Sequence, residues 1–307
     1  MTYLCNLDLF LEKMQKTILV SGANGQLGKS LQQIASDYDG QFRFLFTDVD
    51  TLDITDIAAL RRMVTAEKVD ILINAAAYTA VDKAESDIER AYLLNETAVA
   101  NLATVAKEND VFFIHISTDY VFDGTSSVPY RIGDPTGPTS IYGKSKLAGE
   151  TAIVKSGCRG AIVRTAWLYS PYGNNFVKTM LRLADTKDSI SVVSDQTGCP
   201  TLALDLARFL MAVIAHDGTA DGLKYYHFTN KGRITWFDFA SEILRQAGKS
   251  CPVRPIPTSS YPTPATRPAF SVLDLSESEA IFAIPDWKES LTKVLPEIIY
   301  NYKHNIF

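Results

Sequence analysis

The sequence predicts an α/β fold, a Rossmann-like doubly wound parallel sheet followed by a smaller C-terminal α/β domain. Three observations predict it. From Thr17 onward, short runs of β-branched and aromatic residues alternate with longer helical patterns, as in parallel βα units. One run, 69–77, is apolar almost throughout, which is typical of a strand buried on both faces. The first run ends in a glycine-rich turn that opens a helix.

The expected elements follow this alternation. In the first half, strands are expected at 17–22, 42–48, 69–77, 111–118 and 160–169, and helices at 27–35, 57–66, about 83–109 and around Tyr142. In the second half, strands are expected at 190–201 and 225–230, and helices near 202–215, 236–247 and 288–303. Residues 250–270 carry six prolines, so this segment is expected to be extended or loop.

We expect two domains and an N-terminal extension. Residues 15–170 with about 199–225 form the predicted nucleotide-binding domain, and about 171–198 with 226–307 form the predicted substrate-binding domain. Strand-like sequence begins only at Thr17, just after Met14. Residues 1–14 are therefore predicted to lie outside the fold.

Composition excludes several classes of protein. The chain has 307 residues and a net charge of −5, which argues against nucleic-acid binding. No run approaches the roughly 20 apolar residues of a membrane span. The four cysteines are scattered, so neither a disulfide framework nor a zinc site is indicated and a cytoplasmic location is expected. His115 and His227 lie in strand patterns, where core or hydrogen-bonded roles are expected, and no metal site is predicted.

The segment GANGQLG, residues 22–28, predicts a dinucleotide site. Gly22, Gly25 and Gly28 follow a strand and open a helix, so the backbone can approach a pyrophosphate at the helix N-terminus. Asp48 ends the second strand twenty residues after Gly28, where a carboxylate accepts hydrogen bonds from a ribose. A purely structural turn is the alternative reading of the glycines alone.

Two further motifs follow strands of the predicted sheet. NAAA, residues 74–77, has small side chains that leave room for a cofactor, although tight helix–sheet packing explains them equally well. Ser117, Thr118 and Asp119 end another strand, where ligands of such sheets bind. A hydroxyl there can bond a substrate carbonyl, and a locally capped turn is the alternative.

Tyr142 and Lys146 are four residues apart and therefore share one face of a helix. A tyrosine with its ordinary pKa of ~10 is a poor acid at neutral pH. A nearby ammonium and a nicotinamide cation together lower this pKa by about 3 units, which requires roughly 4 kcal/mol. A solvated Lys146–Glu150 pair is the plain alternative for the same spacing.

Together these motifs resemble the extended short-chain dehydrogenase/reductases. Eight ordered segments narrow the resemblance to the dTDP-4-dehydrorhamnose reductase family: GANGQLG, NAAAYTAVDKAE, STDYVFDG, IYGKSKLAGE, RTAWLY, GNNFVKTM, DQTGCPT and RPAFSVLD. The resemblance implies an NAD(P)H-dependent oxidoreductase that reduces the C4 ketone of dTDP-4-dehydro-L-rhamnose to dTDP-L-rhamnose, the last step of dTDP-rhamnose biosynthesis.

The resemblance also implies residue roles. Tyr142 would protonate the developing alkoxide, Lys146 would lower the pKa of Tyr142 and hold the ribose, and Thr118 would bond the carbonyl oxygen. The implied substrate-binding residues are Thr118, Asp119, Trp167, Asn174, Asn175 and Arg267, of which Arg267 suits a pyrophosphate. The implied cofactor-binding residues are Gly22, Asn24, Gly25, Gln26, Leu27, Gly28, Asp48, Asp53, Ile54, Ala75, Ala76, Ala77, Tyr142 and Lys146.

Some choices stay open. Asp48 favours NADH, yet the family accepts NADPH or NADH. Some family members bind magnesium at a dimer interface through a glutamate where this chain has Ser30, so no such metal is expected and a homodimer stays open. A related nucleotide-sugar 4-ketoreductase or epimerase is the alternative enzyme. A non-catalytic regulatory subunit of methionine adenosyltransferase is the alternative outside catalysis, although the complete Thr118, Tyr142 and Lys146 set argues against it.

Overall fold

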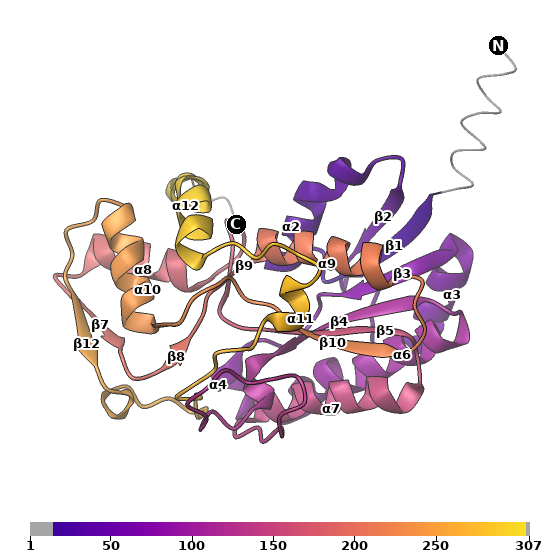
Figure 1. Ribbon diagram of the computed structural model, residues 1–307, viewed down its shortest axis with the longest axis horizontal. Helices are drawn as coiled ribbons and strands as arrows, with labels where there is room; N and C mark the ends of the chain where they lie inside the picture. The colour runs from indigo at the N-terminus through magenta and orange to yellow at the C-terminus, as the bar shows by residue number, and fades with distance from the viewer. Residues whose placement is uncertain (1–14, 305–307) are drawn as a thin grey trace, which may run out of the picture.

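The central element of the computed structural model, which describes residues 15–304, is a six-stranded parallel sheet (Figure 1). The predicted extension, residues 1–14, lies outside the described residues. The strand order is β2-β1-β3-β4-β5-β10, and every neighbouring pair is parallel. The strands are β1 Lys16–Ser21, β2 Phe42–Thr47, β3 Val69–Asn74, β4 Phe112–Thr118, β5 Gly160–Thr165 and β10 Leu223–His227. The predicted Rossmann-like sheet is confirmed.

Helices cover both faces of this sheet. α2 (Gln26–Ile34) and α9 (Ala203–Asp217) pack on one face, and α3 (Ile57–Glu67), α6 (Ala98–Glu108) and α7 (Ile141–Ser156) pack on the other. Because successive side chains of a strand point to opposite faces, β1 contributes to two cores: Ile18 joins the α2/α9 core and Leu19 joins the α3/α6/α7 core. The sheet is therefore buried on both sides, as its apolar strands predict.

Local chemistry defines several helix ends. The Asp56 side chain accepts hydrogen bonds from the amides of Ala58 and Ala59 at the start of α3, and Ser140 caps α7 in the same way. α7 ends at Gly157, which adopts a left-handed backbone conformation (φ 64°). The Tyr142 segment is thus held as a helix from its cap to its last turn.

Three predicted elements are divided in the structure. The expected helix 83–109 consists of α4 (Val81–Ala84), α5 (Ile88–Tyr92), a π-helical turn (Leu93–Thr97) and α6. The expected strand 160–169 breaks at Trp167, whose φ of 49° lies outside strand geometry, and continues as β6 (Leu168–Tyr169). The expected strand 190–201 consists of β7 (Ile190–Val193), β8 (Thr197–Gly198) and β9 (Thr201–Leu202).

The smaller C-terminal α/β region lies at one end of the molecule (Figure 1). Its core contains side chains of α8 (Phe176–Thr186), α10 (Trp236–Gln246) and α12 (Trp287–Lys303). β7 pairs in parallel with β12 (Val253–Ile256), β8 pairs with β11 (Ile234–Thr235), and β6 pairs with β9. The remaining elements are the short helix α11 (Ser276–Glu279) and the 3₁₀ turns Ala35–Tyr38, Asp119–Val121 and Thr258–Ser260.

The sheet order fixes where a ligand can bind. The chain leaves β1 toward β2 on one side and crosses to β3 on the other, so the topological switch lies between β1 and β3. Ligands of open parallel sheets bind at the carboxyl ends of strands at such a switch. Within residues 15–304, no helix is long and apolar enough to cross a membrane, and no three His, Cys, Asp or Glu side chains gather in a metal-binding group.

Candidate active site

The glycine-rich turn after β1 packs against the end of β3. Gly22 has a φ of 75°, and a Cβ there would lie 2.5 Å from the Ala76 nitrogen. A Cβ on Gly28 would lie 2.4 Å from the Gly22 carbonyl oxygen. Gly25 is the N-cap of α2, and no side-chain hydrogen bond caps this helix N-terminus. Close backbone packing and an open helix N-terminus fit a dinucleotide pyrophosphate.

The predicted ribose carboxylate lies beside this turn. Asp48 Oδ2 accepts a hydrogen bond from the Asn24 amide at 2.9 Å, and Asp48 Oδ1 accepts one from the Val49 amide. Asp53 instead caps the following turn through the amide and hydroxyl of Thr55. Ile54 is buried in the core beneath α3 and α6. The structure therefore brings Asp48 to the glycine turn and gives Asp53 and Ile54 local structural contacts.

A cavity of about 550 Å³ opens at the carboxyl ends of β1, β3, β4 and β5. Eleven of the predicted site residues line it: Gly25, Gln26, Leu27, Ala75, Ala77, Thr118, Asp119, Tyr142, Lys146, Trp167 and Asn174. The predicted residues outside its lining are Gly22, Asn24, Gly28, Asp48, Asp53, Ile54, Ala76, Asn175 and Arg267. The glycine turn, the strand-end hydroxyl and the tyrosine–lysine helix thus meet in one space.

Tyr142 and Thr118 are neighbours in this cavity. A hydrogen bond with the Thr118 hydroxyl lowers the pKa of Tyr142, but burial outweighs it and raises this pKa to about 12. The charge of Asp119 acts in the same direction as burial. The Tyr142 ring also meets Tyr120 edge-on at 5.5 Å. With a pKa of about 12, this phenol is fully protonated at neutral pH and can donate a hydrogen bond or a proton.

The Lys146 side chain is buried and points back toward β4. Its Nζ donates a hydrogen bond to the Ile116 carbonyl at 2.6 Å and lies 3.2 Å from His115 Nε2. Burial lowers the pKa of Lys146 to about 8, against the opposing charge of Glu150. The alternative reading, a solvated Lys146–Glu150 ion pair, is absent from the described contacts, because Glu150 binds Arg164 and Ser117.

Asp119 is buried at the end of β4, where it accepts a hydrogen bond from the Thr118 hydroxyl at 2.9 Å. Burial raises the pKa of Asp119 to about 6, although the hydroxyls of Ser271 and Thr118 act against it. A carboxyl group that titrates near neutral pH is thus adjacent to the Thr118 hydroxyl in the cavity wall.

Trp167 and the two asparagines differ in their surroundings. The Trp167 ring stacks on Trp236 with centroids 3.6 Å apart, and its backbone is held at positive φ. Asn174 is exposed at the cavity edge. Asn175 instead caps α8 through the Lys178 amide and donates a hydrogen bond to Gln26 Oε1 at 3.1 Å. Asn175 therefore joins the glycine-turn helix to the C-terminal region.

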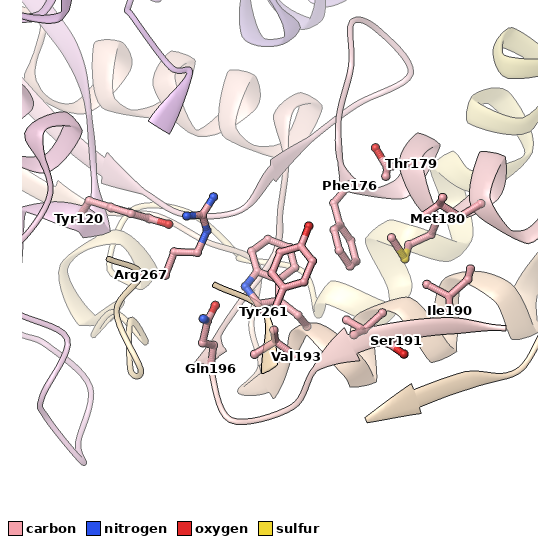
Figure 2. A pocket seen from close by; sticks show the side chains of 13 residues that line it. Tyr120, Phe176, Thr179, Met180, Ile190, Ser191, Val193, Gln196, Tyr261 and Arg267 are labelled. Atoms are coloured by element: carbon pink, nitrogen blue, oxygen red, sulfur yellow. The ribbon is translucent and has the colours of Figure 1, made fainter. Parts of the chain in front are cut away.

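A second cavity of about 380 Å³ shares Tyr120 and Trp236 with the first. Figure 2 shows the Arg267 guanidinium facing Tyr120 at one end of this cavity, with Phe176 and Met180 toward the other. Arg267 binds both carboxylate oxygens of Asp82, at 2.7 and 2.8 Å, and this pairing holds the pKa of Asp82 below its usual range. A mostly apolar space with one guanidinium suits a flat ring attached to a charged group.

Sequence reasoning missed several lining residues. They are Thr79, Val81, Ile116, Tyr120, Thr165, Ala166, Leu168, Gly173 and Trp236 in the first cavity, and Phe176, Thr179, Met180, Leu183, Ile190, Ser191, Val192, Val193, Gln196 and Tyr261 in the second. Thr79 and Val81 follow the NAAA motif closely, so the motif itself is a signal for them. Trp236 and Tyr261 carry no local signal, because only the folded chain brings them to the site.

Comparisons with known proteins agree with this geometry. Residues 15–299 match the family model described as RmlD substrate binding domain. A dTDP-4-dehydrorhamnose reductase of Aggregatibacter actinomycetemcomitans is 40% identical over 287 residues, which cover 90% of this chain and 97% of the relative. The crystal structure of a dTDP-4-dehydrorhamnose reductase from Clostridium acetobutylicum is 42% identical, with a TM-score of 0.86 over 91% of this chain and 98% of that one.

The structure of a dTDP-4-dehydrorhamnose reductase from Bacillus anthracis in complex with NADP is also similar. It is 36% identical, with a TM-score of 0.87 over 92% of this chain and 100% of that one. These similarities extend over the glycine turn, the tyrosine–lysine helix and the C-terminal region alike. The chain therefore belongs to the dTDP-4-dehydrorhamnose reductase family.

Proposed function

We propose that this chain reduces the C4 ketone of dTDP-4-dehydro-L-rhamnose to give dTDP-L-rhamnose, with Thr118, Tyr142 and Lys146 as its catalytic residues. As a member of the family, it is an NAD(P)H-dependent oxidoreductase of dTDP-rhamnose biosynthesis. The observation that carries the residue assignment is the single 550 Å³ cavity that these three side chains share with the glycine turn.

In this proposal the turn around Gly25 and the α2 N-terminus hold the pyrophosphate of NADPH or NADH, and Asp48 accepts hydrogen bonds from the adenosine ribose. Ala75 and Ala77 leave space beside the β3 end for the cofactor. A bound nicotinamide supplies the hydride. Asp48 carries negative charge next to the ribose, so the site favours NADH while the family as a whole uses NAD(P)H.

The sugar ketone lies against the Thr118 and Tyr142 hydroxyls. The Thr118 hydroxyl, which donates to Asp119 in the free protein, rotates to donate its one hydrogen bond to the ketone oxygen as negative charge grows there, which stabilises the transition state more than the ground state. Tyr142 gives its proton to that oxygen. The positive charge of Lys146 stabilises the resulting tyrosinate, and the Lys146 ammonium returns a proton to it.

The nucleotide part of the substrate occupies the second cavity. Its aromatic and aliphatic wall, with Phe176 and Met180, accepts the base, and Arg267 contacts the pyrophosphate. Asp119, Trp167 and Asn174 contact the sugar where the two cavities meet. The free thiols of Cys158, Cys199 and Cys251 suit the cytoplasm, which we propose as its compartment.

The test is reduced-cofactor oxidation with dTDP-4-dehydro-L-rhamnose, followed with NADPH and NADH in parallel. Tyr142→Phe should lower kcat at least ~100-fold, the scale of a lost general acid, with cofactor affinity nearly unchanged. Tyr300→Phe, which alters an exposed tyrosine outside both cavities, is the matched control.

Wild-type turnover by Tyr142→Phe would remove Tyr142 from its role. Turnover of a different nucleotide ketosugar, with none of dTDP-4-dehydro-L-rhamnose, would instead support a related ketoreductase or epimerase activity. Cofactor binding without turnover of any ketosugar would favour the regulatory-subunit alternative.

A further inference from the structure

His115 is fully buried inside β4 and sits between two polar groups. Its Nδ1 lies 3.1 Å from Asn74 Nδ2 at the end of β3, and its Nε2 lies 3.2 Å from Lys146 Nζ on α7. Burial and the charge of Lys146 hold the pKa of His115 well below its usual value, so its ring is neutral. A neutral imidazole has one N–H donor and one acceptor nitrogen, and its neighbours decide which is which.

The neighbours of Asn74 decide this proton position. The Ala76 amide, which can only donate, lies 3.1 Å from Asn74 Oδ1, and the Ser21 hydroxyl donates to the same oxygen at 2.8 Å. The other end of the side chain, Nδ2, therefore faces His115, and an amide nitrogen can only donate. His115 Nδ1 must accept this hydrogen bond, so the ring proton lies on Nε2.

This tautomer has a consequence for Lys146. The His115 Nε2–H points at Lys146 Nζ, and an ammonium group has no lone pair to accept it. A neutral amine has one lone pair, which accepts from His115 Nε2–H, and it still donates to the Ile116 carbonyl at 2.6 Å. We propose that His115 is a positioning residue of the reductase site, which fixes the Lys146 nitrogen on β4 and, through its Nε2–H, favours the neutral amine.

Two other ionisable side chains, Glu150 and Tyr142, lie one helical turn from Lys146. Glu150, one helical turn away, raises the pKa of Lys146 against burial, but its carboxylate is paired with Arg164 through two hydrogen bonds at 2.7 and 3.0 Å and accepts a third from Ser117. Tyr142, one turn before, is a neutral phenol. Among residues 15–304, His115 is thus the only ionisable side chain that lies within hydrogen-bond distance of Lys146 Nζ.

The role in turnover rests on the proposed function. When Tyr142 has given its proton to the sugar oxygen, the tyrosinate takes a proton from the Lys146 ammonium and leaves the amine. The neutral amine of Lys146 then accepts a hydrogen bond from His115 Nε2–H, and the proton stays on His115. A water molecule later returns a proton to the Lys146 amine. His115 stabilises the form of Lys146 that this transfer produces, so the lysine exchanges protons near neutral pH.

The first test is the ¹⁵N chemical shifts of histidine in the wild-type protein without substrate or cofactor. The expected result is a protonated Nε2 and an unprotonated Nδ1 for His115. An Nδ1–H tautomer or an imidazolium at neutral pH would overturn the proposal. Because this measurement needs no variant, it does not depend on a substitution that folds.

The second test is the titration of Lys146, followed by NMR of ε-¹³C-labelled lysine and assigned by the signal lost in Lys146→Arg. His115→Asn places an oxygen near Nδ1, so it keeps the bond from Asn74 and removes the Nε2–H. The Lys146 pKa should rise by about one unit, a tenfold change in its acidity constant. His227→Asn, which alters a buried histidine on β10, should leave the Lys146 titration unchanged.

The same titration in wild type and His115→Asn would overturn the proposal. In the reductase assay of His115→Asn, the alkaline limb of the plot of kcat against pH should shift to higher pH with the Lys146 pKa. The KM for the reduced cofactor should change little. Both NMR tests are made without substrate. They therefore test the role of His115 even if the protein does not reduce the dTDP-sugar.

Discussion

At the scale of single residues, the surroundings of Tyr142 and Lys146, the two residues proposed as catalytic, determine their protonation. Tyr142 and Lys146 share a helix face, yet the lysine nitrogen is held by the Ile116 carbonyl and His115 of β4. Burial moves the two pKa values apart: it raises that of Tyr142 to about 12 and lowers that of Lys146 to about 8. The phenol is therefore a donor in the free protein, and its acidity depends on what binds beside it.

Asp119 gives a pH prediction at this scale. Its folded pKa of about 6 exceeds the unfolded value of ~3.9, so the folded state binds the proton more tightly. Stability from this group is present below the unfolded pKa and is lost as pH rises through 6. Between pH 5 and pH 7.5 the loss is about 1 kcal/mol. Asp119→Asn should lack this part of the pH dependence of the free energy of unfolding.

Denaturant unfolding of both proteins at the two pH values measures the difference. Asp195→Asn is the control, because Asp195 has a lowered pKa from its Thr258 hydrogen bonds and is already ionised over this range. An equal fall in stability for wild type and Asp119→Asn would show that Asp119 does not titrate near pH 6.

At the scale of elements, the glycine turn after β1, the proposed cofactor site, depends on close backbone packing. In Gly28→Ala the new Cβ would meet the Gly22 carbonyl oxygen at 2.4 Å and Ala23 Cα at 2.5 Å, both backbone atoms. The turn must move, so the free energy of unfolding should fall by about 1–3 kcal/mol and NADPH affinity should fall with it.

Thermal unfolding and NADPH titration by fluorescence test this. Gly133→Ala is the matched control, since a Cβ there meets no atom within 4 Å and its φ lies outside the left-handed region. Wild-type NADPH affinity in Gly28→Ala would show that the turn tolerates a side chain and does not approach the pyrophosphate closely.

At the scale of the whole molecule, the site joins segments far apart in the chain. Arg267 of the C-terminal region binds Asp82 of α4, which lies 185 residues earlier. Gln26 of α2 accepts hydrogen bonds from Ser170 and Asn175. These contacts join the segments that line the two cavities, and the proposed binding of one dTDP-sugar across both cavities depends on them.

Arg267→Lys should raise the KM for the dTDP-sugar about 10-fold, or about 1.4 kcal/mol, because lysine lacks the planar fork that binds phosphate and Asp82 together. The kcat and the KM for NADPH should change little. Arg254→Lys, an exposed arginine on β12, controls for loss of a guanidinium. A selective fall in kcat would instead place Arg267 in the chemical step.

The sequence determined the sheet, most of its helices and many of the residues that line the cavity at the strand ends. Apolar residues such as Ile71, Leu72 and Ile73 are buried because helices cover both faces of the parallel sheet, and strand ends carry the polar groups that meet at one edge. Local patterns could also identify the Gly22–Gly28 turn and the Tyr142–Lys146 pair, since each lies within one βα unit or one helix.

Only the tertiary structure decided which groups those residues face. In the folded chain Lys146 contacts His115, and Glu150 pairs with Arg164. Asn175 caps a helix and donates a hydrogen bond to Gln26. The tertiary structure also broke the predicted strand at Trp167 and stacked that ring on Trp236 from a segment 69 residues later. The reason is physical: residue spacing fixes a face within an element, whereas burial and hydrogen-bond partners depend on packing between elements.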